Sequence, residues 1–356
     1  MHPPDLRASV RSLAATAGFD DCRVAAAGTA PHAEVFHRWL ADGCHGTMDW
    51  MARDPMRRSD PRLVLPGCRS VVVLALNYFP GPRPARPEDR ATGRIARYAW
   101  NLDYHDLVLP RLRALAASME PWGGTQKCYT DTGPVLERDF ASLAGLGWNG
   151  KSTVQIHPRL GTWFFLGVIL TTLEIEPDAP ERDRCGHCTR CLAACPTGAL
   201  TAPHRLEARL CLSYLTIEHK GDFPVELRPL LGDRIFGCDD CLEACPWNRF
   251  AHTARESAFL ARPAVFGMGL RDFLALDDEG FRALFRGSPV KRIKRPRFLR
   301  NVCVALGNTG SPDDAPALRQ AAADPDPLIA GHAAWALDRL AERFGAPASE
   351  APAASA

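Results

Sequence analysis

Eight cysteines, seven in two short runs and one between them, have the spacing that points most directly to chemistry. The first run, residues 185–196, places cysteines at 185, 188, 191 and 195 and ends in proline. This C-x2-C-x2-C-x3-C-P spacing is typical of bacterial proteins that hold two [4Fe–4S] clusters. The second run, residues 238–246, repeats the last three cysteines and the proline, and Cys211 between the runs can supply an eighth thiolate.

The spacing also predicts which thiolates share a cluster. Three cysteines two residues apart can direct their sulfurs to one cubane, whereas the fourth, just before proline, points to the neighbouring cluster. Crossed ligation therefore predicts one set made of Cys185, Cys188, Cys191 and Cys245, and a second made of Cys195, Cys211, Cys238 and Cys241. Structural zinc sites are the alternative, but they usually show isolated C-x2–4-C pairs rather than a four-cysteine run.

Composition sets limits on the class of protein. The chain has 356 residues, of which 46% are hydrophobic and 24% charged, as in ordinary globular proteins of two or three domains. A net charge of +2 means that any nucleic-acid affinity must come from a local patch. Iron–sulfur clusters suit a reducing compartment. The start of the sequence shows no secretory or twin-arginine pattern. The apolar run 162–173 is too short for a membrane span. We therefore expect a cytoplasmic protein with no membrane partner.

Before the cysteine runs, strands and helices alternate. The hydrophobic patterns predict helices over 4–17, 34–41, 102–119 and 135–146, strands over 22–25, 69–78, 126–131 and 161–174, and a loop over 43–60. Such alternation favours an α/β domain, which places ligands at the carboxyl ends of its strands. Asp131 falls at such an end, although an aspartate there can equally bond a turn or cap a helix. Glu137 and Arg138 are expected to form a structural ion pair.

Residues 145–152 match the phosphate-binding pattern G-x4-G-K-[ST], with Gly145, Gly150, Lys151 and Ser152 at the required offsets. A phosphate-binding loop follows a strand and opens a helix. Here the predicted helix comes before the match and an apolar, strand-like stretch comes after it. The context therefore argues against nucleotide hydrolysis.

The chain changes character past residue 250. Residues 291–300 hold six basic side chains in ten, and helical patterns follow over 300–306, 315–322 and 328–340, which resemble one and a half HEAT-type repeats. A basic stretch is usually a solvated face, but at the start of a helical-repeat module it is a candidate nucleic-acid contact. The candidates are Lys291, Arg292, Lys294, Arg295 and Arg297, together with Ser213 and Lys220 between the cysteine runs. Residues 345–356 are predicted to be a disordered tail.

Four motifs occur in a fixed order along the chain. They are Arg97-Tyr98 with Asp103-Tyr104-His105, then the segment 131–138, then the first cysteine run with Pro196-Thr-Gly-Ala-Leu200, and finally Gly237-Cys-Asp-Asp-Cys241 through Asn248. This ordered set, covering about residues 5–340, resembles the epoxyqueuosine reductase family.

The resemblance implies an enzyme with cobalamin and two [4Fe–4S] clusters that reduces epoxyqueuosine to queuosine at the wobble position of tRNA. It implies that Asp131 donates a proton, and that corrinoid contacts come from Arg58, Arg97, Gln155, His157 and Leu166 besides Asp131. The expected partners are the tRNA anticodon stem-loop, rather than DNA, and an external low-potential electron donor. The basic helical module would hold the stem-loop.

Three consecutive domains and a tail follow from this view: a corrinoid-binding α/β domain (1–175), a ferredoxin-like two-cluster domain (176–255), a HEAT-like helical module (256–344) and the tail (345–356). A corrinoid reductive dehalogenase is one alternative, but those enzymes typically carry a twin-arginine signal and lack the basic tail. A ferredoxin-type electron carrier is the other, but it would need neither the long region before the clusters nor the module after them.

Overall fold

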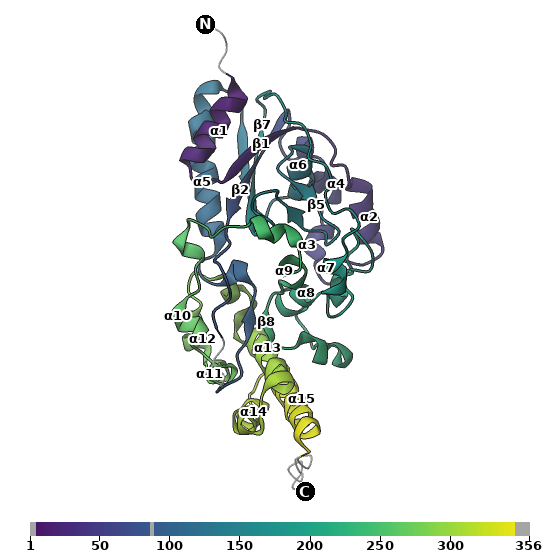
Figure 1. Ribbon diagram of the computed structural model, residues 1–356, viewed down its shortest axis with the longest axis vertical. Helices are drawn as coiled ribbons and strands as arrows, with labels where there is room; N and C mark the ends of the chain where they lie inside the picture. The colour runs from purple at the N-terminus through teal and green to yellow at the C-terminus, as the bar shows by residue number, and fades with distance from the viewer. Residues whose placement is uncertain (1–4, 86–88, 346–356) are drawn as a thin grey trace. The chain divides into compact units, whose positions relative to one another are not determined.

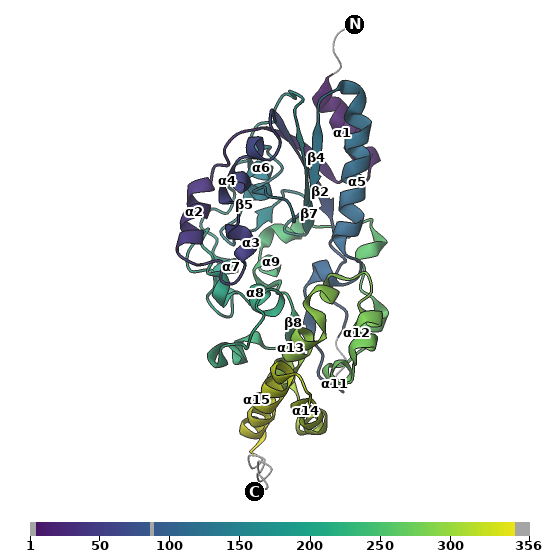
Figure 2. The same ribbon diagram turned by 180° about the vertical axis from the view of Figure 1, so that it is seen from behind.

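The computed structural model describes residues 5–85 and 89–345 and divides them into two compact units (Figures 1 and 2). The first unit consists of the described residues of Met1–Gly81, Leu102–Arg209 and Asp239–Phe259, and the second of those of Pro82–Asn101, Leu210–Cys238 and Leu260–Ala356. The three consecutive domains predicted above do not coincide with these interleaved units and stay a prediction. The predicted disordered tail lies outside the described residues except for Gly345.

A four-stranded sheet forms the centre of the first unit. Its strand order is β1-β2-β7-β4, with β1 at Asp21–Ala26, β2 at Ser70–Asn77, β7 at Phe164–Thr171 and β4 at Gln126–Tyr129. Every residue of β2 is buried, as its apolar run predicts. All three strand pairs are antiparallel, although strand–helix alternation is more typical of parallel sheets.

Helices cover both faces of this sheet. In both views α1 (Leu6–Thr16) and α5 (Tyr104–Met119) lie together on one side, and α6 (Glu137–Leu143) lies on the other (Figures 1 and 2). Val71, Val73 and Ala75 alternate along β2 toward the α6 side, where they join one buried cluster with Phe140. On the opposite face Gly167 allows close approach of α5, because a Cβ there would lie 2.9 Å from the methyl groups of Leu112.

Short elements complete the first unit. They are α2 (Ala33–Ala41), α3 (Asp49–Ala52), α4 (Pro55–Ser59), β5 (Trp148–Asn149), β6 (Gln155–Ile156), α7 (Arg190–Ala193) and α9 (Asp240–Glu243). The predicted loop 43–60 therefore contains two helices, and the Asp54 side chain caps α4 by accepting from the Arg57 N–H at 3.2 Å. The segment 145–152 follows helix α6, contains β5 and is followed by β6. A phosphate-binding loop would instead follow a strand and open a helix, so the structure agrees with the argument against such a loop.

The second unit is mainly helical. Strands β3 (Arg94–Ile95) and β8 (Arg234–Phe236) pair in parallel, and the helices are α8 (Leu212–Ile217), α10 (Pro263–Phe266), α11 (Leu270–Leu274), α12 (Asp278–Leu284), α13 (Lys294–Thr309), α14 (Ala315–Ala322) and α15 (Pro327–Phe344). Three of these helices match the predicted C-terminal helical patterns, while their grouping as a HEAT-like repeat stays a prediction.

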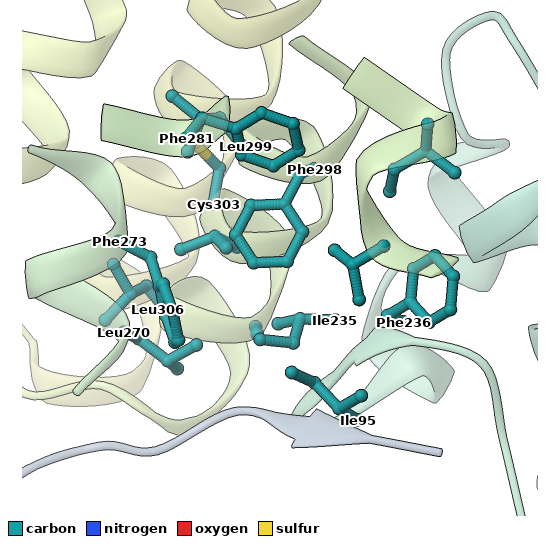
Figure 3. Packing of buried hydrophobic residues seen from close by; sticks show 14 of the residues in the cluster. Ile95, Ile235, Phe236, Leu270, Phe273, Phe281, Phe298, Leu299, Cys303 and Leu306 are labelled. Carbon is teal, nitrogen blue, oxygen red and sulfur yellow. The ribbon is translucent and has the colours of Figure 1, made fainter. Parts of the chain in front are cut away.

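Helix α13 is the core of the second unit. Figure 3 shows Phe298 of α13 between Phe273 of α11 and Phe281 of α12, with ring centroids 5.4 and 5.5 Å away. Ile95 and Ile235 bring the strand pair into the same buried cluster. No helix in residues 5–85 and 89–345 combines the length and hydropathy needed to cross a membrane.

Candidate functional site

The two cysteine runs fold alike around the short helices α7 and α9. Each helix ends in an Ala-Cys-Pro sequence, and the cysteine N–H closes the turn by donating to the leucine carbonyl three residues earlier. The distance is 3.2 Å from Cys195 N to Leu192 O, and 3.1 Å from Cys245 N to Leu242 O. The proline cannot continue the helix, so the chain leaves at the same point in both runs. Helices α7 and α9 pack against each other within the first unit (Figure 1).

This packing brings the thiol of Cys245 to those of Cys185, Cys188 and Cys191. Burial raises the pKa of Cys245 to about 11, and the neighbouring charges of the three other thiolates contribute to the rise. Burial likewise raises the pKa of Cys191, with Cys185 and Cys188 adding to it. A group of four neighbouring thiolates needs a cationic iron cluster or protons between them. No three His, Cys, Asp or Glu side chains of the described residues are placed to hold one metal ion.

The tryptophan Trp148 lies beside this group of four thiols. It is buried, and its ring meets that of Trp247 edge-on with centroids 4.8 Å apart. Burial raises the pKa of Cys185, and the backbone N–H of Lys151 and the indole of Trp148 oppose that rise. The indole nitrogen makes no hydrogen bond of ordinary geometry within the described part of the chain.

The other four predicted ligands are divided between the units. Cys195 and Cys241 belong to the first unit, and Cys211 and Cys238 belong to the second. Cys211 precedes α8 as its N-cap residue, and Cys238 directly follows the turn after β8. The sulfur of Cys195 lies 3.7 Å from the hydroxyl of Thr197. The assignment of these four to one cluster therefore rests on the spacing in the sequence.

Asp131 stands on a tight turn two residues beyond β4, rather than in the strand itself. Its φ of +60° is a left-handed conformation that aspartate adopts more readily than most residues. Its side chain is 64% exposed, but the Oδ2 oxygen lies against other side chains of the protein. The Tyr104 hydroxyl donates to Oδ2 at 2.7 Å, and His105 Nε2 lies 3.7 Å from the same oxygen. The Tyr104 ring is fixed in turn by stacking on Phe165 of β7, with centroids 4.3 Å apart and planes 10° from parallel.

Asp103 orients His105 at the start of α5. As the N-cap residue, it accepts a hydrogen bond from the His105 backbone N–H at 3.1 Å. The same oxygen, Oδ1, lies 2.8 Å from His105 Nδ1. Both side chains are nearly covered, with 11% and 12% exposed. One carboxylate therefore caps the helix and holds the imidazole ring toward Asp131.

Glu137 holds the Asp131 turn from the other side. Its Oε1 accepts a hydrogen bond from the Asp131 backbone N–H at 3.0 Å. Burial raises the pKa of Glu137 to about 8, and the negative charge of Asp131 adds to the effect. The expected ion pair with Arg138 is wrong for the described residues, because the Arg138 guanidinium donates instead to the Thr153 carbonyl at 2.8 Å.

Two of the predicted corrinoid contacts lie around Asp131. Arg58 donates to the Gly133 carbonyl at 3.3 Å and to the Trp50 carbonyl at 3.1 Å. Leu166, the one position of β7 that is not buried, accepts from the Thr130 hydroxyl at 2.8 Å through its backbone carbonyl. These two residues therefore join the surroundings of Asp131 within the first unit.

The other three predicted corrinoid contacts have partners of their own within the fold. The His157 imidazole is buried, with Nε2 at 3.0 Å from Asp21 Oδ2, and its Nδ1 accepts two backbone N–H bonds. Gln155 is buried too; oriented to suit its neighbours, its amide accepts from the Trp148 backbone N–H at 3.1 Å. Arg97 belongs to the second unit, where its guanidinium lies over the Trp100 ring at 5.5 Å. His157 and Gln155 are therefore held by hydrogen bonds within the first unit, and the role of all three residues as corrinoid contacts stays a prediction.

The basic stretch at the start of α13 divides into exposed and structural side chains. Lys291, Arg292 and Lys294 are exposed, as is the candidate Lys220, while Ser213 is half-buried on α8. By contrast, Arg295 pairs with Asp324 at 2.8 Å, and Arg297 donates to the carbonyls of Ile293 and Ile217, both at 2.9 Å.

Arg300 is fully buried at the same stretch. Its guanidinium donates to the backbone carbonyls of Leu215, His219 and Gly221. Burial lowers its pKa to about 9. It stabilises the packing of the unit and offers nothing to a partner.

Sequence reasoning gave no role to Tyr104 or His105, although both lie in a quoted motif. Their partner Asp131 lies more than twenty residues later, so no local pattern joins them. One signal was present in the sequence. Asp103 comes directly before a predicted helix and two residues before His105, and an aspartate in this position can both cap the helix and contact the histidine ring.

Comparisons with known proteins agree with this arrangement. Residues 58–132 match the family model described as epoxyqueuosine reductase QueG, and residues 184–248 match a 4Fe-4S double cluster binding domain. The chain is 42% identical to an epoxyqueuosine reductase of Xanthomonas campestris over 94% of this chain and 96% of that one. It is 38% identical to that of Escherichia coli, over 86% and 82%.

Solved structures give the same result. An epoxyqueuosine reductase in complex with an epoxyqueuosine-modified stem-loop of tyrosine tRNA superposes with a TM-score of 0.88 at 30% identity, covering 94% of this chain and 90% of that one. A Bacillus subtilis epoxyqueuosine reductase whose catalytic aspartate loop is swung out of the active site gives 0.86 at 29% identity, covering 94% and 90%. The chain belongs to the epoxyqueuosine reductase family.

Proposed function

We propose that this protein reduces the epoxide of epoxyqueuosine in tRNA to the alkene of queuosine, using cobalamin and two [4Fe–4S] clusters. Family membership supports the activity, and the relative solved with a modified stem-loop supports the substrate. The observation that carries the proposal at the level of residues is the Asp131 turn. The carboxyl group of Asp131 is exposed there, and the Tyr104 hydroxyl fixes one of its two oxygens by a hydrogen bond.

The thiols suit the clusters. Cys185, Cys188, Cys191 and Cys245 are grouped within one unit, and the charges of their neighbours add to the raised pKa of Cys191 and Cys245, a donor set that a cationic cubane would satisfy. We assign Cys195, Cys211, Cys238 and Cys241 to the second cluster from their spacing in the sequence. An external low-potential donor supplies the electrons, and we place the reaction in the cytoplasm, where tRNA and a reducing poise coexist.

The residues around Asp131 suit a corrinoid partner. Arg58 is a half-buried cation, and Leu166 is a partly exposed apolar side chain on an otherwise buried strand. Such residues would hold a large, mostly apolar macrocycle with polar side groups. Cobalamin, when bound, supplies a low-valent metal able to attack an epoxide carbon. Gln155 and His157 are held by the buried hydrogen bonds described above.

Asp131 is the proposed proton donor. Reduction of an epoxide to an alkene opens one C–O bond, breaks the second, forms C=C and releases water, and it consumes two electrons and two protons. The ring oxygen therefore has to be protonated as it becomes a leaving group. A positioned carboxylic acid contributes about 10²- to 10⁴-fold to such a step.

The tRNA would meet an exposed basic surface on the second unit. Lys291 and Arg292 are exposed just before α13, Lys294 is exposed as its first residue, and Lys220 is exposed after α8. Lysine and arginine side chains of this kind bind phosphates and set the salt dependence of nucleic-acid binding. Arg295 and Arg297 support this surface through their internal bonds rather than by contact with RNA.

Replacing Asp131 by Asn tests the role of this residue. The amide keeps the size of the side chain and its ability to accept from Tyr104, but it carries no transferable acid proton. We expect Asp131→Asn to retain iron, cobalamin and stem-loop binding while turnover on epoxyqueuosine tRNA falls at least about a hundredfold. Asp106→Asn, an exposed aspartate on α5, is the control with the same change of charge. Turnover within a few-fold of wild type in Asp131→Asn contradicts the assignment.

A further inference from the structure

Each turnover takes up two protons, whereas Asp131 holds one. We propose that His105, held by Asp103, returns a proton to Asp131 during turnover, so that one carboxyl group protonates the substrate oxygen twice. The first proton is taken as the epoxide C–O bond opens, and the second as the oxygen leaves as water. This inference rests on the proposed function and assigns a relay role to His105, which acts through Asp131.

The two oxygens of Asp131 are differently placed. Tyr104 and His105 both face Oδ2, at 2.7 and 3.7 Å, while no contact of Oδ1 is found among the described residues. The side chain is 64% exposed, so Oδ1 is the oxygen turned outward, toward any substrate. A carboxyl group placed in this way can accept a proton at the inner oxygen and, after rotation about its Cβ–Cγ bond, donate that proton to the substrate from the outward position. The second proton then comes from His105 and does not have to come from bulk water.

Asp103 fixes the state of the imidazole that this relay needs. Its carboxylate accepts from the ring at Nδ1, at 2.8 Å, and it is anchored by its second bond to the helix start. A neutral ring hydrogen-bonded to a carboxylate carries its hydrogen at that nitrogen, so Nε2 presents a lone pair toward Asp131. When the ring gains a proton at Nε2, the Asp103 carboxylate stabilises the cation. His105 can therefore take a proton and deliver it to Oδ2.

The distance from His105 Nε2 to Asp131 Oδ2, 3.7 Å, is longer than a hydrogen bond. Hydrogen bonds that act in a reaction are often long before the substrate binds and shorten in the complex. Asp131 is the residue that has to move, and it lies on the turn two residues beyond the end of β4. His105 is fixed in place by α5 and by Asp103. A shift of the Asp131 turn by less than 1 Å brings the pair to about 3 Å.

The neighbouring groups are less suited to the relay. Tyr104 donates its hydroxyl hydrogen to Oδ2 at 2.7 Å, so it holds this oxygen in place. Glu137 contacts the backbone N–H of Asp131 and not its carboxyl group, so it fixes the turn. When a bound nucleotide covers the exposed Oδ1 of Asp131, His105 still lies beside Oδ2 on the protein side.

The first experiment is imidazole rescue of His105→Ala in the holoenzyme, with both clusters and cobalamin bound. We expect multiple-turnover reduction of epoxyqueuosine tRNA to fall about a hundredfold, with unchanged stem-loop binding. Added imidazole and methylimidazoles should restore the rate, and the rescued rate should vary with the pKa of the added base. His252→Ala, an exposed histidine replaced in the same way, should show neither effect.

A purely structural role would cost activity without such rescue, so a His105→Ala rate that no imidazole changes overturns the relay. Near wild-type turnover in His105→Ala overturns it as well. Failure of the proposed function is recognised separately, because wild-type holoenzyme would then leave epoxyqueuosine tRNA unreacted.

The second experiment needs no cofactor. Ring ¹⁵N chemical shifts of His105 in the full chain distinguish the two neutral tautomers. We expect hydrogen at Nδ1 in the wild type and a changed tautomer ratio in Asp103→Asn, because the amide can donate to the ring as well as accept from it. A wild-type ring with its hydrogen at Nε2 overturns the relay. So does a ratio that Asp103→Asn leaves unaltered.

Discussion

Replacing Glu137 by Gln should make the protein more stable at alkaline pH and leave its stability at pH 5 unchanged. Glu137 accepts the Asp131 backbone N–H at 3.0 Å, and Gln can accept it through the same oxygen. The substitution therefore keeps the hydrogen bond and removes the titration. Burial, aided by the charge of Asp131, raises the pKa of Glu137 from the usual 4.5 to about 8.

The sign and size follow from proton linkage. Below pH 4.5 the carboxyl is protonated in both the folded and the unfolded chain, so it has no effect. Between pH 4.5 and 8 only the unfolded chain releases the proton, and stability falls as the pH rises. At about 1.36 kcal/mol per pKa unit, the full shift gives a ceiling of about 5 kcal/mol. The side chain is only half-buried, and solvent screening reduces the expected loss to about 2 kcal/mol.

The assay is the apparent melting temperature of the cluster-loaded protein, compared between wild type and Glu137→Gln under anaerobic conditions from pH 5 to pH 9. A gain of about 2 kcal/mol corresponds to about 4–8 °C for a unit of this size. Glu207→Gln is a matched control of opposite sign, because hydrogen bonding to Arg209 lowers the pKa of Glu207. That variant should lose stability above pH 4.5.

Equal melting differences for Glu137→Gln at pH 5 and at pH 9 would refute this reasoning. The carboxyl would then titrate near its ordinary range in the folded protein. It would follow that Asp131 stands on a turn held by a charged glutamate rather than by a neutral one.

Two further predictions concern the clusters and the RNA surface. Trp148→Phe keeps a buried aromatic ring but removes the indole N–H that opposes the raised pKa of Cys185, so the midpoint potential of the cluster bound there should fall in an EPR-monitored redox titration; an unchanged potential would argue against this effect of Trp148. Lys291→Ala combined with Arg292→Ala should flatten the dependence of stem-loop affinity on log salt concentration by about 1 unit of slope; an unaltered slope would remove both residues from the phosphate contacts.

Local patterns in the sequence predicted individual elements well. The apolar run ending at Tyr78 became β2, and the amphipathic stretches near the N-terminus became α1 and α2. Their side-chain periodicity depends on burial of one face, which acts over a few residues. Strand direction depends on which strands meet, and nothing local indicates that β1, β2, β7 and β4 all run antiparallel to their neighbours. The parallel pairing of Arg94–Ile95 with a strand some 140 residues later is non-local in the same way.

The basic stretch 291–300 contains side chains of two kinds, those exposed to solvent and those bonded within the fold. Six basic residues in ten predicted a surface, but α13 turns every third or fourth side chain toward the core. Phe298 and Leu299 lie between the arginines and mark that buried side, so Arg297 and Arg300 follow the core and bond backbone carbonyls. Helical periodicity applied to the charged residues of α13 would have separated them from the exposed Lys294.

The electron-carrying and proton-carrying parts of the proposed site are encoded differently in this chain. The thiols lie in two runs whose short helices and Cys-Pro endings fold alike, so the spacing alone states most of the ligand arrangement. The acid site is assembled from the start of α5, the turn after β4 and the first residue of α6, and only the sheet brings these together. A single substitution can therefore change proton delivery at Asp131 while both cysteine runs keep their local structure. This separation makes the roles of His105 and Glu137 measurable in protein that retains its clusters.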